Sequence, residues 1–171
     1  MIYKLDTQKS KIEFTATAPF HRFKGWAEKG LDGYIDIDFE NNIINDINVI
    51  IKTEYFETGD KLKSKEMQKY IKSDIMPDSY FKLTEFRKMT KTDVYPDAES
   101  YDISVTGILS FMDTERKLDL QIKASKADNR LYADVSFDWS FKNYGLKPPH
   151  ILFIKVKDTV KISAYLEFIK E

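Results

Sequence analysis

The chain has 171 residues, which is enough for one domain with a sizeable buried core. Its 27 Lys and Arg residues are balanced by 28 Asp and Glu residues, so we expect neither a nucleic-acid partner nor a polybasic patch for membranes. The absence of cysteine excludes disulfide bonds, thiol catalysis and thiolate metal sites within this chain.

Apolar and polar residues alternate in the first third of the chain, as they do in strands with one buried face. The apolar face of segment 12–20 consists of Ile12, Phe14, Ala16, Ala18 and Phe20. Segments 34–39 and 45–53 repeat the alternation, although Ile50 interrupts the second of them. Three strands are therefore predicted in this part of the sequence.

A single helix is predicted from about Asp60 to Ser73, where the alternation stops. Met67, Tyr70 and Ile71 share one face of this segment at helical spacing. Its first residue is a good N-cap, and Pro77 prevents the helix from continuing. The segment is rich in lysine, but acidic residues interrupt the run. We interpret the lysines as a solvent-exposed face and the apolar stripe as packed on the protein.

Alternation returns after the helix and predicts five more strands, in segments 81–86, 101–111, 116–125, 130–141 and 158–169. About eight strands with so little helix between them cannot form a βαβ sheet, so an all-β antiparallel barrel or sandwich is predicted. No linker, repeat or low-complexity tract divides the chain, and we expect residues 1–171 to form one domain. Alanines alternate with rings on the apolar faces, which fits a filled barrel or a barrel with a lumen.

Residues suited to catalysis or metal binding are sparse. His21 and His150 are the only imidazoles, and their separation matches no metal-binding spacing. Nucleotide-binding and serine-hydrolase motifs are absent from the sequence. Asp36 and Asp38 share one face of a predicted strand, where we interpret them as solvated charges. We therefore expect no metal, no cofactor and no catalytic residue.

The amino-terminal sequence MIYKLDTQKSKIEF contains no apolar run. We therefore expect neither a signal peptide nor an integral membrane segment in this sequence. The expected location is cytoplasmic for the sequence as it stands, and periplasmic if a leader has been removed. A homodimer remains open, because the sequence does not determine the oligomeric state.

Five sequence blocks that together cover nearly the whole chain occur in a familiar order. They are YKLDTQKSKIEF, HRFKGWAEKGLDGYIDID, KYIKSDIMPDSYFKLTEF, VTGILSFMDTERKLDL and SFDWSFKNYGLKPPHILFIKVKDTVKISAYLEF. In this order and spacing the chain resembles the YceI-like family of lipid-binding or polyisoprenoid-binding proteins. The resemblance implies an eight-stranded antiparallel lipocalin-like barrel with one short helix capping an end. It also implies a long apolar tunnel that holds a lipid chain.

The function expected from this resemblance is binding of an amphiphilic lipid, which the protein sequesters or transports without acting as an enzyme. The lipid would be a polyisoprenoid, an isoprenoid quinone or a fatty-acyl chain. The expected tunnel walls are Phe14, Phe20, Phe111, Phe137 and Trp139. The expected tunnel mouth is Tyr70, Ile71, Ile75, Met76 and Phe81. His21 or Asn143 is expected to meet a headgroup or quinone ring.

Two other functions remain open from the sequence. The first is a small-molecule isomerase or hydrolase that uses a histidine and a carboxylate inside the cavity, which requires His21 or His150 to face an acid there. The second is a stress-related interaction protein whose barrel is filled with side chains. An internal cavity would argue against that second alternative.

Overall fold

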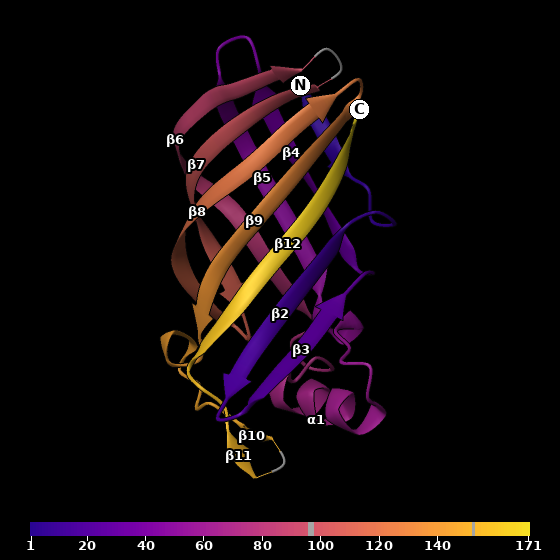
Figure 1. Ribbon diagram of the computed structural model, residues 1–171, viewed down its shortest axis with the longest axis vertical. Coiled ribbons are helices and arrows are strands. Elements are labelled where there is room, and N and C mark those ends of the chain that lie inside the picture. Colours follow the sequence, from indigo (N-terminus) through magenta and orange to yellow (C-terminus); the bar gives the residue numbers. More distant parts are fainter. Residues whose placement is uncertain (96–97, 152) are drawn as a thin grey trace.

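The computed structural model describes residues 1–95, 98–151 and 153–171, most of which lie in one antiparallel sheet (Figure 1). The strands are β1 (Ile2–Leu5), β2 (Lys11–Ala18), β3 (His21–Ala27), β4 (Leu31–Asp38), β5 (Ile43–Lys52), β6 (Asp78–Tyr95), β7 (Ala98–Phe111), β8 (Thr114–Ala127), β9 (Arg130–Ser140), β10 (His150–Ile151), β11 (Ile154–Lys155) and β12 (Thr159–Lys170). The helices are α1 (Lys61–Ile71) and the short 3₁₀ turns η1 (Thr53–Tyr55) and η2 (Lys142–Tyr144). None of the helices in the described ranges has the length and apolarity needed to cross a membrane.

The sheet closes on itself because β1 pairs with a strand on each side. One edge of β1 pairs with β4, and the other pairs with the end of β12. The ring consists of β1, β4, β5, β6, β7, β8, β9 and β12. The predicted eight-stranded antiparallel barrel with one short helix is therefore confirmed.

Strands β2 and β3 form a hairpin beside this ring. One edge of β12 pairs first with β2, from Val160 to Tyr165, and then with β1, from Phe168 to Lys170. Segment 12–20, one of the eight predicted strands, therefore lies outside the ring, and β1 and β3 were not predicted. Strand β1 has four residues, too few to show an alternation, and β3 mixes polar and apolar residues irregularly in HRFKGWA.

The outer edge of β3 is joined to the segment that leads into α1. Trp26 and Glu57 exchange two backbone hydrogen bonds of 2.9 Å, and the Trp26 Nε1–H donates to the Glu57 carboxylate at 2.7 Å. Helix α1 lies at the same end of the barrel as the β2–β3 turn, whereas both chain termini lie at the opposite end (Figure 1). The helix thus closes the side of the barrel that the hairpin leaves unpaired.

Helix α1 forms where it was predicted. The Asp60 carboxylate accepts a hydrogen bond from the Lys63 N–H at 3.0 Å, and Lys72 ends the helix in the left-handed conformation with φ 52°. The Gln68 side-chain amide donates to the Phe56 carbonyl oxygen at 2.7 Å. This bond ties the helix to the chain that enters it and orients the helix against the barrel.

Side chains fill the barrel at the end where the termini lie. The Tyr3 and Phe39 ring centroids are 6.1 Å apart, and the Phe39 and Tyr101 centroids are 5.2 Å apart. Tyr3 and Tyr101 are almost fully buried. Rings in edge-on and tilted contact contribute packing beyond their buried area. This end of the barrel is therefore closed.

Charged groups link three segments at the seam of the barrel. Arg130 begins β9, Asp6 follows β1, and Glu167 lies on β12. The Arg130 guanidinium pairs with both carboxylates, and Glu167 is buried. The Ser10 hydroxyl accepts a hydrogen bond from the Glu167 N–H at 3.0 Å. Charge-assisted bonds thus hold together the strands whose pairing closes the ring.

Gly107 on β7 lets the Phe81 ring approach the sheet. A Cβ at position 107 would lie 2.3 Å from that ring and 2.4 Å from the Lys82 carbonyl oxygen. We predict that Gly107→Ala lowers the free energy of unfolding by about 1–3 kcal/mol, because backbone as well as side chain would have to shift. Urea unfolding followed by circular dichroism measures this change. Ser104→Ala on the same strand is the control, with an expected loss under about 0.5 kcal/mol; equal stability of the two variants would contradict the close packing.

Candidate ligand-binding cavity

Alternating residues of β9 and β12 line one side of an internal cavity of about 730 Å³. These residues are Leu131, Ala133, Val135, Phe137 and Trp139 on β9, and Val160, Ile162, Ala164, Leu166 and Phe168 on β12. At roughly 3.4 Å per residue, the row on β12 is about 27 Å long. The cavity therefore follows most of the length of the strand. Its presence contradicts the filled-barrel alternative.

Small side chains keep this interior open. Ala124 on β8 is the cross-strand partner of Ala133 on β9, and Ala164 on β12 is the partner of Val135. The interior of an eight-stranded barrel is just wide enough for side chains to fill it or for one small ligand to enter. Alanines at these positions leave the interior open for a ligand, and the cavity volume is typical of small-molecule sites.

The chemistry of the cavity wall changes along the barrel. Towards the filled end the lining is hydrocarbon and includes Ile35, Ile47, Ile103, Leu131 and Phe168. The charged lining residues are Arg22, Lys24, Lys63 and Glu66, which come from β3 and α1. We call this polar end, which His150 also lines, the mouth of the cavity.

Aromatic rings cluster around Trp139 near the mouth. The Trp139 ring centroid lies 4.8 Å from that of Phe141, 5.3 Å from that of Tyr144 and 5.4 Å from that of Phe111. The Tyr144 hydroxyl donates a hydrogen bond to the Leu109 carbonyl oxygen at 3.0 Å. Burial raises the pKa of Tyr144 to about 12, so this hydroxyl keeps its proton near neutral pH. The cluster is a rigid apolar rim.

Helix α1 and the turn η2 are both fastened to this rim. The Tyr70 ring packs edge-on against Phe141, with centroids 6.0 Å apart, and its hydroxyl donates to the Lys147 carbonyl oxygen at 2.5 Å. The Asp158 carboxylate accepts hydrogen bonds from the Ser140 hydroxyl at 2.5 Å and from a backbone N–H of η2 at 2.9 Å. The Ser140 bond is the larger cause of the lowered pKa of Asp158.

Seven of the twelve predicted ligand-binding residues line the cavity. They are Phe14, Tyr70, Ile71, Phe81, Phe111, Phe137 and Trp139. Strand alternation placed the rings on β2, β7 and β9 correctly, and helical spacing placed the two residues of α1. Contact with a ligand stays a prediction for all seven.

Phe20 and His21 lie outside the cavity lining, so the expected position of Phe20 in the tunnel wall is wrong, whereas the expected contact of His21 with a headgroup stays a prediction. Phe20 occupies the turn between β2 and β3 with φ 62° and is fully exposed. The alternation ends with the strand at Ala18, because the chain turns there. His21 is exposed, and its ring stacks on Phe23 with centroids 6.2 Å apart.

Ile75, Met76 and Asn143 also lie outside the cavity lining, so they are near the mouth but do not form part of the cavity wall. Ile75 is 70% exposed after the end of α1. The Met76 carbonyl oxygen accepts a hydrogen bond from the Thr53 hydroxyl at 3.5 Å. Asn143 is exposed in η2, where its N–H donates to the Ser140 hydroxyl at 3.3 Å. These residues are close in sequence to α1 or to Gly145, but closeness in sequence does not place a side chain in the cavity lining.

Most polar residues at the mouth were not predicted from the sequence. Arg22 lies on β3 and Lys63 on α1, and no local sequence pattern predicts that both line the same cavity. His150 was noted as one of two histidines without a position. In the described part of the chain, neither histidine makes a hydrogen bond or ion pair with a carboxylate, and no three potential metal ligands group together. The pair that the enzyme alternative requires is not found among these residues.

Solved structures share this fold at low sequence identity. A polyisoprenoid binding domain from Saccharophagus degradans implicated in plant cell wall breakdown has a TM-score of 0.79 and 14% identity, with 99% of this chain and 98% of that chain covered. BcnA from Burkholderia cenocepacia has a TM-score of 0.76 and 15% identity, with coverages of 95% and 98%. The YceI protein of Campylobacter jejuni has a TM-score of 0.64 and 12% identity, with coverages of 82% and 81%.

At the level of sequence, no curated protein matches the chain. A comparison with protein families, in contrast, matches residues 3–168 to the YceI-like domain. The match includes both the ring of strands and the β2–β3 hairpin with its covering helix. The chain therefore belongs to the YceI-like domain family.

Proposed function

We propose that the barrel binds the apolar chain of an amphiphilic lipid and sequesters or transports it without chemical change. The observation that carries this proposal is the cavity of about 730 Å³, whose inner wall is hydrocarbon and whose charged residues are confined to the mouth. A polar solute would lose its hydrogen bonds to water in the interior and find few partners there, whereas a hydrocarbon chain has no hydrogen bonds to lose. The Saccharophagus degradans domain, described as polyisoprenoid binding, supports a prenyl chain as the ligand.

Burial of the chain supplies enough free energy for binding. Each methylene removed from water contributes about 0.8 kcal/mol, so ten of them contribute about 8 kcal/mol before the cost of ordering the ligand. The row of side chains along β12 is long enough to contact a chain of this size. Catalytic or ionic groups are therefore not needed to hold the lipid.

The residues at the mouth favour an anionic headgroup. Arg22, Lys24 and Lys63 outnumber the one acid, Glu66, in the charged part of the lining. The Lys63 ammonium lies 5.7 Å from the centroid of the Phe23 ring, a cation–π contact that holds it near the opening. Phosphate and carboxylate groups form charge-assisted hydrogen bonds with such side chains. A prenyl phosphate and a fatty acid both fit this chemistry, and a neutral quinone fits it less well.

The protein as purified is expected to carry a bound lipid. Native mass spectrometry is expected to show a bound mass that lipid extraction identifies as a prenyl or acyl compound, because an apolar cavity of this size captures such chains from the cell. Thermal unfolding of the delipidated protein should shift upward on addition of a prenyl phosphate or a fatty acid. A ligand-free mass together with no shift by either lipid would contradict the proposed function.

A bulky side chain inside the barrel should obstruct the cavity. Ala164→Trp places an indole in the cavity, and we expect at least a tenfold weaker affinity for a fluorescent fatty acid, because the indole occupies the path of the chain. Ser163→Trp is the matched control, since Ser163 is the neighbouring residue on β12 and its hydroxyl lies 3.1 Å from that of Ser136 outside the cavity lining. Its affinity should equal that of the wild type. If both tryptophan variants bind alike while remaining folded, the ligand does not lie in the cavity.

A further inference from the structure

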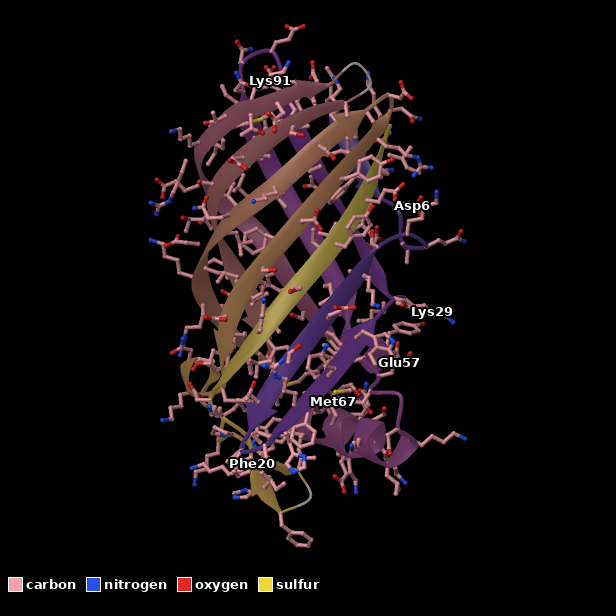
Figure 2. All side chains as sticks on the ribbon, in the orientation of Figure 1. Asp6, Phe20, Lys29, Glu57, Met67 and Lys91 are labelled. Atoms are coloured by element: carbon pink, nitrogen blue, oxygen red, sulfur yellow. The ribbon has the colours of Figure 1, made fainter. Side chains whose placement is uncertain are left out.

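The most exposed large apolar side chains gather at the mouth end of the barrel. Phe20 is 104% exposed, Phe153 is 101%, Leu62 is 76% and Ile75 is 70%. Elsewhere in the described chain, no large apolar side chain exceeds 48%. Figure 2 shows Phe20 at the same end of the molecule as Met67 of α1, and Figure 1 shows the β10–β11 hairpin, which carries Phe153, protruding there. These four side chains form what we call the apolar tips.

Two of the apolar tips stand in turns that disfavour them. Phe20 joins β2 to β3 with φ 62°, and Phe153 lies between β10 and β11 with φ 65°. A left-handed backbone conformation favours glycine or asparagine, and a bulky ring there is uncommon. Neither ring gains burial within the chain in return. Their presence in two turns at the same end of the barrel points to a contact outside the molecule.

Basic residues outnumber acidic ones in the segments that carry the apolar tips. These three segments, 19–24, 60–76 and 142–158, contain eleven Lys and Arg residues and four Asp and Glu residues, whereas the β7–β8 turn and the start of β8 beside the rim add Asp113, Glu115 and Arg116. The rest of the chain contains sixteen basic and twenty-four acidic residues. The near-zero charge of the whole chain therefore conceals an excess of basic residues in these three segments.

We propose that this mouth end docks on an anionic lipid bilayer, with Phe20 and Phe153 inserted among the headgroups. Aromatic and aliphatic side chains enter the interfacial layer of a membrane, and lysines beside them are attracted to anionic lipids. The apolar tips come from three separate segments of the chain, each of which also carries basic residues, a pattern that suits a bilayer better than a continuous protein interface. Because the cavity opens at the same end, docking brings its mouth to the headgroup layer. The docking itself does not depend on what the cavity holds.

Vesicle flotation tests this proposal with the intact protein. Wild-type protein should float with vesicles that contain about one third phosphatidylglycerol, should bind vesicles of phosphatidylcholine alone much less, and should be released by salt. The double variant Phe20→Ser/Phe153→Ser should bind the anionic vesicles at least tenfold more weakly, because the inserted rings are gone. Both rings are fully exposed, so the variant is expected to keep its fold.

A charge-reversal variant separates the electrostatic part. Lys61→Glu/Lys65→Glu alters two exposed lysines of α1, and each lysine near an anionic surface strengthens binding roughly fivefold, so at least about a twentyfold loss is expected. Lys9→Glu/Lys29→Glu changes the net charge equally at two exposed lysines away from the mouth, since Lys9 follows β1 with its N–H bonded to the Asp6 carbonyl oxygen and Figure 2 shows Lys29 above α1. Ile2→Ser/Ile43→Ser removes two partly exposed apolar residues at the opposite end. Both control variants should bind like the wild type.

Three results would overturn the docking proposal. The first is absence of binding to anionic vesicles. If the phenylalanine changes then abolish self-association of the protein, the surface binds a second copy of the chain instead. The second is equal vesicle binding by the mouth variants and their controls. The third is loss of vesicle binding by Ala164→Trp, which blocks the cavity and leaves the apolar tips intact. That result would attribute the membrane contact to the carried lipid, whereas we expect this variant to bind vesicles normally.

Discussion

Hydrogen bonding along both edges of β12 determines the shape of this protein. One edge pairs with β9 over almost the whole strand, and the other is divided between β2 and β1. This arrangement closes eight strands into a ring and leaves the β2–β3 hairpin beside it. A ring of eight turns alternate side chains inward and leaves room for one ligand only where those side chains are small. The cavity is thus a consequence of strand number and of the alanines on the inner faces.

The two ends of the barrel differ in chemistry, which gives the cavity a direction. Tyr3, Phe39 and Tyr101 close the end near the termini with packed rings. At the other end, three segments far apart in sequence bring together basic residues, exposed rings and the rim around Trp139. A lipid chain would therefore enter with its tail towards the termini and its headgroup at the basic end. The proposed membrane-docking surface lies at this same end.

Regular alternation made the long strands and much of the cavity wall predictable from sequence. The rows on β9 and β12 persist for most of the strand length, so their inward faces were identified correctly. Strand β1 was too short to show a pattern, and Phe20 continued an alternation past the residue where the chain turns. The shared position of Arg22, Lys63 and His150 in the cavity lining could not be predicted, because these residues are distant in sequence and lie on β3, α1 and β10, which only the tertiary fold brings to one cavity.

Fluorescence of Trp139 tests the central claim, the occupation of the cavity by an apolar chain. The chain contains two tryptophans, and Trp26 lies at the Glu57 bridge, so Trp26→Phe leaves Trp139 in the cavity wall as the single reporter. Titration with a fatty acid brominated along its chain should quench this fluorescence saturably, with one ligand per protein. Quenching that fails to saturate, or no quenching while the lipid still stabilises the protein against heat, would place the ligand elsewhere and contradict the account.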